Sequence, residues 1–173
     1  MSTETPKRYH PVHVTLHWII AVMTILAILV GMFVLNPIPD TPEKTSMLGF
    51  HALWGGLLGL LLVARLITRF ALPRPAPATT NNAFLDFVAK MVHFLLYLGI
   101  ISMVVSGLGT ALQANLSAVF RGAASFPTDF MAYPPRIGHG YTALVLLALI
   151  SLHFAAAMYH QIIKKDNLLS RMW

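Results

Sequence analysis

The stretch that decides the fold is residues 137–163, which read IGHGYTALVLLALISLHFAAAMYHQII and contain no Asp, Glu, Lys or Arg. About 20 apolar residues are enough for a helix to cross the ~30 Å hydrocarbon core of a bilayer. Two histidines, His139 and His153, stand 14 residues apart in this run. In one helix they would lie ~21 Å apart along the axis and ~40° apart around it, which is nearly one face.

Three other stretches also lack charged residues: 9–39, 45–64 and 91–120. The chain is 57% hydrophobic and 10% charged, whereas a soluble domain carries roughly 25% charged residues. Helices satisfy their own backbone in lipid. The sequence therefore predicts an all-α fold, a transmembrane four-helix bundle that forms a single integral membrane domain over residues 1–173. The expected helices are 12–35, 46–70, 84–112 and 137–163.

The basic residues predict how the bundle is oriented. Nine of the twelve Lys and Arg residues flank one set of helix ends and three flank the other. By the positive-inside rule both termini are cytoplasmic, and the 36–45 and 113–136 loops face outward. The net charge of +6 is then explained by lipid headgroups, and no nucleic-acid partner is expected. The three basic residues on the outer side are Lys44, Arg121 and Arg136.

Two absences from the sequence narrow the function. The chain has no cysteine, which excludes disulfides, iron–sulfur clusters and thiolate chemistry within it. No acidic residue falls inside an expected span, whereas pumps and ion-coupled transporters generally need intramembrane carboxylates. A redox role would therefore use a histidine-bound metal or an organic cofactor.

Four histidines pair by their expected depth in the membrane. His17 and His153 lie toward the cytoplasmic side, and His51 and His139 toward the outer side. Two ligands of one iron must meet at one level, so the pairing predicts an inner and an outer bis-histidine haem, with one ligand of each on the last helix. The alternative is that these side chains satisfy one another or reach to headgroups.

Other polar residues are weaker candidates for cofactor or substrate contacts. His13 is a rival ligand one turn before His17 and is expected at the surface. His160 and Lys164 are expected either to contact a quinone or to meet headgroups. His93 is expected to contact a haem edge or a quinone. Arg65 is expected either to pair with the propionates of the inner haem or only to orient the protein in the membrane. Arg121 and Arg136 are expected to attract anions, or the propionates of the outer haem, on the outer face.

The chain resembles the bacterial cytochrome b561 family over roughly residues 9–172. The resemblance is carried by Leu16-His17-Trp18, Gly49-Phe50-His51, the stretch from Leu152 to Ala157 (LHFAAA) and Lys165-Asp166-Asn167. It implies a four-helix membrane protein with two haem b groups bound by His17, His51, His139 and His153. It also implies location in the bacterial inner membrane and electron exchange with ubiquinone.

The resemblance leaves several functions open. A quinone-linked oxidoreductase acting alone or as a homodimer is expected first, and superoxide oxidation at the outer face with delivery of electrons to ubiquinone is its specific form. The second reading is a cytochrome b anchor subunit that takes electrons from a separate redox partner, such as a dehydrogenase or hydrogenase. The third is a haem-free structural or transport bundle.

Overall fold

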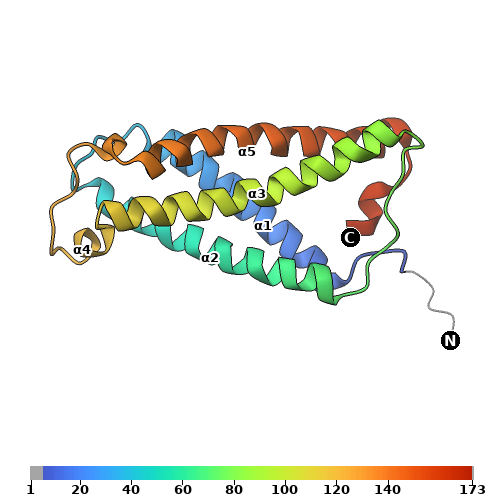
Figure 1. The fold of residues 1–173 in the computed structure, drawn as a ribbon, viewed down its shortest axis with the longest axis horizontal. Helices are drawn as coiled ribbons and strands as arrows, with labels where there is room; N and C mark the ends of the chain where they lie inside the picture. Colours follow the sequence, from blue (N-terminus) through green and yellow to red (C-terminus); the bar gives the residue numbers. More distant parts are fainter. Residues whose placement is uncertain (1–5, 173) are drawn as a thin grey trace.

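The computed structural model describes residues 6–172, and these form a bundle of long helices (Figure 1). The helices are α1 (Pro11–Leu29), α2 (Lys44–Ala71), α3 (Ala83–Gln113), α4 (Leu116–Phe120) and α5 (Pro134–Met158). A π-helical segment extends α1 over Val30–Leu35, and another extends α5 over Tyr159–Lys164. Short 3₁₀ turns cover Phe130–Ala132 and Leu168–Met172.

Local signals set where the helices begin. Pro11 is in the first turn of α1, where its missing N–H is not needed. The Asn82 side chain caps α3 by accepting from the Phe84 and Leu85 N–H groups. Pro134 and Pro135 open α5 in the same way as Pro11 opens α1.

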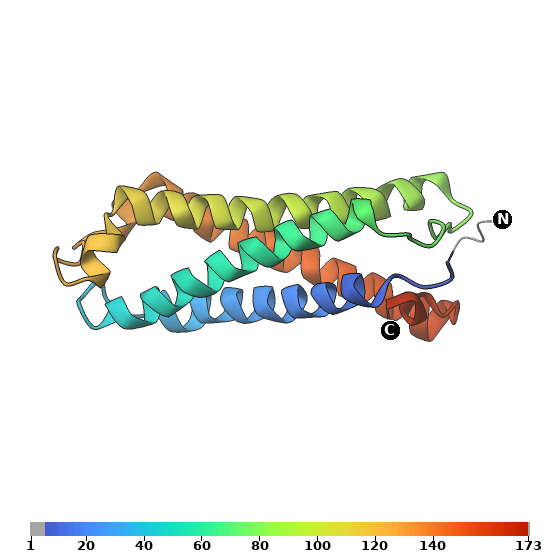
Figure 2. The same cartoon turned by 90° about the horizontal axis from the view of Figure 1, so that it is seen from below.

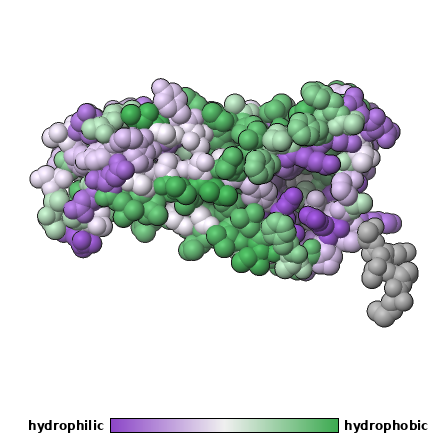
Figure 3. Space-filling view, in the orientation of Figure 1, coloured by the Kyte–Doolittle hydropathy of each residue, from purple (hydrophilic) through white to green (hydrophobic). Residues whose placement is uncertain are grey.

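Four helical segments are long and apolar enough to cross a membrane: Pro11–Leu35, Lys44–Ala71, Ala83–Gln113 and Pro134–Lys164. The predicted all-α bundle with four spans is therefore confirmed. On the face shown in Figure 3, apolar residues cover the middle of the bundle and polar residues gather toward its two ends. Large side chains such as Phe50, Phe70 and Leu60 are more than 70% exposed, as expected for a surface that faces lipid.

Two helix pairs, α1 with α2 and α3 with α5, make the most extensive contacts in the bundle. Figure 2 shows all four long helices running along the length of the molecule, and the first and last described segments meet at one end, where Tyr9 contacts Arg171. Gly99 allows the close approach of α3 and α5, because a Cβ built there would lie 2.9 Å from Cδ1 of Leu146, which is 1% exposed. Gly59 similarly faces Val104 across the α2–α3 contact.

The 113–136 connection contains structure that the sequence did not predict. Its short helix α4 and the Phe130–Ala132 turn cover one end of the bundle, where Leu116, Val119 and Phe130 pack with Leu35 and Leu48 in a buried cluster. The opposite end is closed by the C-terminal turn. There the Tyr9 N–H donates to the Arg171 carbonyl, and the Trp18 indole N–H donates to the Met172 carbonyl.

A buried ion pair joins the two loops at the α4 end. The Lys44 ammonium, 6% exposed as a residue, donates to Asp40 at 2.8 Å and to the Ile38 carbonyl at 2.8 Å. The second Asp40 oxygen accepts from the Phe130 N–H at 2.9 Å. Burial alone would raise the pKa of Asp40, but the bonds from Lys44 and then Phe130 outweigh it and hold that pKa below its usual range.

We expect Asp40→Asn to lower the free energy of unfolding by about 1–3 kcal/mol near neutral pH, because it leaves the Lys44 ammonium without its charged partner. A carboxyl whose pKa is depressed by folding stabilises the fold above its unfolded pKa of about 3.9 and loses that effect as pH falls through the folded value. Thermal unfolding in detergent should therefore show a difference between wild type and variant that closes below pH ~4. A difference that is constant with pH would contradict the role of the charge.

Candidate haem sites

The structure brings the four expected histidines together as two facing pairs. The ring centroids of His17 and His153 are 6.3 Å apart, and those of His51 and His139 are 6.2 Å apart. The first members of the pairs come from α1 and α2, and both second members come from α5. Because α5 is a continuous α-helix between His139 and His153, the two pairs lie about 21 Å apart along it.

The pair separations match one metal ion between two imidazoles. A five-membered ring with bonds of ~1.3–1.4 Å has a radius of roughly 1.15 Å. Centroids 6.2–6.3 Å apart therefore leave about 4 Å between facing nitrogens, which is two metal–nitrogen bonds of ~2 Å. Zinc or copper in a protein-only site would need further side-chain donors, and the described residues hold no group of three or more His, Cys, Asp or Glu that could bind a metal.

Three of the four imidazoles have nothing else to bind. Within residues 6–172, His17, His51 and His153 make ring contacts but no hydrogen bond. A polar group without a partner is costly in an apolar environment. Two imidazole rings that face each other at this separation, each with at least one nitrogen that makes no hydrogen bond, are what two axial ligands require, so the residues fit a bis-histidine haem.

The fourth imidazole is oriented by α3. The Ser106 hydroxyl donates to the Ser102 carbonyl at 2.6 Å, and its oxygen lies 3.0 Å from Nδ1 of His139. Because the hydroxyl proton is directed to the carbonyl, Ser106 accepts from Nδ1–H of His139. That tautomer leaves Nε2 of His139 with a lone pair for a metal. The sequence prediction missed Ser106, although Ser102 and Ser106 put two hydroxyls on one face of an apolar span.

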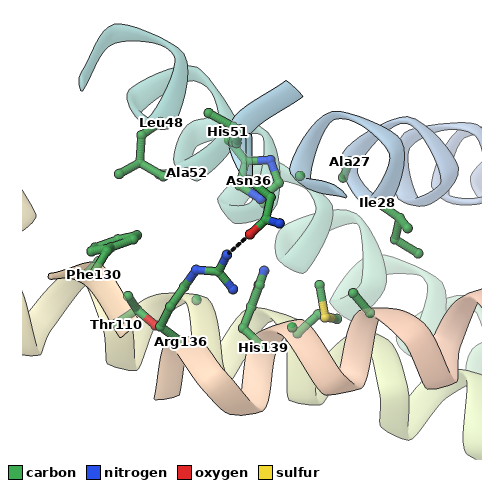
Figure 4. A pocket seen from close by; sticks show the side chains of 18 of the residues that line it. Ala27, Ile28, Asn36, Leu48, His51, Ala52, Thr110, Phe130, Arg136 and His139 are labelled. Atoms are coloured by element: carbon green, nitrogen blue, oxygen red, sulfur yellow. Dashed lines mark hydrogen bonds between the residues drawn. The ribbon is translucent and has the colours of Figure 1, made fainter. Parts of the chain in front are cut away.

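A cavity of about 600 Å³ surrounds the outer pair, and its lining residues come from all four long helices. Ligand pockets commonly have ~300–1,000 Å³. Figure 4 shows His51 and His139 pointing toward one another across this cavity. Glycines make the room: no atom lies within 4 Å of a Cβ built at Gly55 or Gly56, and Gly107 places the α3 backbone against His139. Gly31 likewise faces the His51 ring.

The outer cavity has a cationic end. Arg136 lines it and donates to the Asn36 side chain at 3.2 Å (Figure 4). Lys44, which the sequence prediction did not select, lines it as well. Arg121, in contrast, is exposed at the end of α4 and is not among the residues that line the cavity.

The inner pair also has an arginine beside it. The Arg65 guanidinium donates to the His13 carbonyl at 2.7 Å and lies within electrostatic reach of both His17 and His153. Arg69, one turn further along α2, lies over the Tyr97 ring at 5.6 Å, and the Tyr97 hydroxyl is buried close to Arg65. Each histidine pair is thus accompanied by at least one cation able to bind carboxylates.

The expectation that His13 lies at the surface is wrong. Its side chain is 4% exposed, its Nδ1 lies 2.9 Å from the Thr68 hydroxyl, and its ring stacks on Tyr9. Thr68 and Arg65 reach from α2 and enclose it. His13 therefore joins α1 to α2 and faces no second histidine that would make it a ligand pair.

His160 lies near the end of the last span, in the π-helical segment. Its Nδ1 is 2.5 Å from the Asp166 carboxylate. This hydrogen bond holds the pKa of Asp166 below its usual range. Lys165 and Asn167, with φ of 54° and 57°, turn the chain so that Asp166 meets His160. The role of Asp166 was not predicted from the sequence.

The fold and these sites define a class of protein: a four-helix membrane bundle with two imidazole pairs stacked across the bilayer. A family model described as prokaryotic cytochrome b561 matches residues 8–173. The chain belongs to the prokaryotic cytochrome b561 family. It is therefore a bacterial membrane protein that carries haem b and transfers electrons.

Curated relatives agree over nearly the whole chain. Cytochrome b561 homolog 2 of Escherichia coli (strain K12) is 29% identical over 98% of this chain and 93% of its own. Cytochrome b562 of Cereibacter sphaeroides is 27% identical over 95% of this chain and 94% of its own. Cytochrome b561 homolog 1 of Escherichia coli (strain K12) is 25% identical over 96% of this chain and 97% of its own. No solved structure gives a significant match.

The open space at Gly55 predicts a size limit for the outer site. We expect Gly55→Leu to lower the haem content of the purified protein, because a branched side chain there would occupy the cavity. The matched control is Gly55→Ala, whose Cβ meets no atom within 4 Å, and it should keep its haem. A pyridine haemochrome assay with a protein determination measures both variants, and equal haem content in Gly55→Leu would contradict the placement.

Proposed function

We propose that the chain holds two haem b groups, with His17 and His153 as axial ligands of the inner one and His51 and His139 of the outer one. The observation that carries this proposal is the equal 6.2–6.3 Å separation of the two imidazole pairs, both of which include a residue of α5. Haem b, when bound, supplies one-electron exchange between ferric and ferrous iron. Two imidazole ligands leave that iron no vacant position, which favours electron transfer over dioxygen binding.

The polar residues beside each pair complete the proposed sites. Arg65 would neutralise carboxylates of the inner haem and Arg136 those of the outer haem. The Ser106 hydroxyl fixes the orientation of His139. Most residues that line the outer cavity are apolar, which would limit contact of the reduced centre with water. These residues hold the two groups in line across the membrane at the ~21 Å spacing that α5 sets.

We infer that electrons enter at the outer end and leave to ubiquinone at the inner end. Both chain ends lie at the end of the bundle that contains the His17/His153 pair, and the excess of Lys and Arg at this end supports a cytoplasmic position for it. His160 and Lys164 are the proposed quinone contacts. Nδ1 of His160 is occupied by Asp166, so Nε2 is the nitrogen that would meet a quinone oxygen.

The proposed outer donor is superoxide, a small anion. Arg136 at the polar end of the outer cavity supports attraction of an anion to this side. Lys44 beside it is already paired with Asp40. Two superoxide ions would each give up one electron and become dioxygen, and one ubiquinone would take up these two electrons and two protons to become ubiquinol. The chain would then act as a superoxide:ubiquinone oxidoreductase that works alone or as a homodimer.

The ligand assignment predicts the number of haems and which one is lost on substitution. A reduced-minus-oxidised spectrum and a pyridine haemochrome assay of the detergent-purified protein should give two b-type haems per chain. His153→Ala should lose the inner haem and keep the outer, because the outer pair does not use it. Retention of two bis-imidazole haems in His153→Ala would overturn the assignment.

The quinone contacts predict a separate effect on kinetics. In His160→Leu, haem content should be unchanged while the rate at which ubiquinol reduces the haems falls at least tenfold, because the contact to the quinone oxygen is lost. Stopped-flow absorbance measures this rate, and reduction by dithionite serves as the control. Unchanged ubiquinol kinetics would place the quinone elsewhere.

A further inference from the structure

A fifth histidine, His93 on α3, lies against the inner pair. Its ring centroid is 5.0 Å from that of His153, and the two rings are nearly perpendicular, at 84°. This separation is shorter than the 6.3 Å between His17 and His153. At this separation the two rings are too close for an iron between them. No hydrogen bond joins them among the described residues, but a rotation of the rings about their side-chain torsions would bring a nitrogen of one within hydrogen-bonding distance of a nitrogen of the other.

The hydrogen bond at the other nitrogen defines which form of His93 faces its neighbour. Nδ1 of His93 lies 2.6 Å from the Ala89 carbonyl oxygen. A carbonyl only accepts, so Nδ1 carries the proton, and Nε2 of the neutral ring has a lone pair. In an apolar span this lone pair needs a donor, since water does not supply one in the hydrocarbon core.

His153 has the matching requirement. An axial imidazole that binds a metal through one nitrogen carries N–H on the other, and this N–H is almost always donated to an acceptor. Within the described residues, His153 has ring contacts with His17 and His93 and makes no hydrogen bond. His93 is therefore the acceptor that the fold places beside it.

The outer pair shows the same arrangement with its hydrogen bond formed. Ser106, also on α3, accepts from Nδ1–H of His139 at 3.0 Å. Ser106 is 13 residues after His93 on α3, and His139 is 14 residues before His153 on α5. At ~1.5 Å per residue these intervals are about 20 and 21 Å. The antiparallel helices α3 and α5 thus present one acceptor at the level of each α5 histidine.

We propose that His93 is a positioning residue for the inner haem: its Nε2 accepts a hydrogen bond from the ring N–H of His153 that faces away from the iron. The proposal rests on the assignment of His17 and His153 as ligands. An acceptor on this N–H makes the imidazole a stronger electron donor. It stabilises ferric over ferrous iron and lowers the reduction potential of the inner haem relative to the same ligands without the acceptor.

The test compares three variants of the haem-loaded protein by potentiometric titration, with optical and electron paramagnetic resonance detection. His93→Leu removes the acceptor, and His93→Gln keeps an oxygen that accepts. Ser106→Ala is the matched control at the outer haem. We expect His93→Leu to keep both haems and to raise the reduction potential of the inner haem by about 59 mV, which is a tenfold change in the ferric/ferrous ratio for one electron. His93→Gln should return the potential most of the way to the wild-type value. Ser106→Ala should raise the potential of the outer haem alone.

Two results would overturn the proposal. Unchanged inner potential and resonance signals in His93→Leu would show that no hydrogen bond to His153 matters. Loss of the inner haem in both His93→Leu and His93→Gln would show that His93 is itself a ligand. His153→Ala tests the ligand assignment separately. An inner haem that survives His153→Ala contradicts the assignment itself, whereas loss of the inner haem in His153→Ala together with an unchanged inner potential in His93→Leu contradicts the role of His93 alone. Should His93→Leu fail to fold, the Gln variant still reports both the haem content and the potential.

Discussion

The constraint on which the rest of the structure depends is the cost of an imidazole without a partner in lipid. His17, His51 and His153 have no hydrogen bond within residues 6–172, yet they lie in spans that cross an apolar layer. A metal between two such rings removes the cost for both at once. The helices are accordingly arranged so that each imidazole faces another at nearly the same separation, 6.2 or 6.3 Å.

A single helix organises both sites. Because α5 supplies one histidine to each pair, its straight α-helical geometry sets their spacing, and α1 and α2 need only bring one partner to each level. This arrangement also explains where glycines occur in the bundle. Gly55 and Gly56 leave space beside the outer pair, while Gly59, Gly99 and Gly107 let α3 approach α2, α5 and the His139 ring. Room for a macrocycle and close helix packing are thus divided between different glycines.

The helix that supplies no proposed ligand has its own part in the site. α3 carries Ser106 against His139 and His93 against His153, so it acts on the α5 histidines from the side opposite the expected metal positions. Arginines act from the ends, with Arg136 near the outer pair and Arg65 near the inner. At each end of the bundle an α3 side chain lies against an α5 histidine and an arginine lies near the pair. Because these residues differ between the two ends, the two histidine pairs have different electrostatic surroundings.

By itself the sequence determined the four spans and which of the four paired histidines lie at the same level along the bundle, because apolar length and residue spacing translate directly into position along a helix. Only the tertiary structure decided the burial of His13 by Thr68 and Arg65, the Ser106 and His93 contacts, and the Asp40–Lys44 link to Phe130. Most of these contacts join residues 30 or more positions apart in the chain, and they depend on how each helix is rotated about its axis. In lipid that rotation is set by packing against neighbouring helices, which the spacing of residues along one helix does not specify.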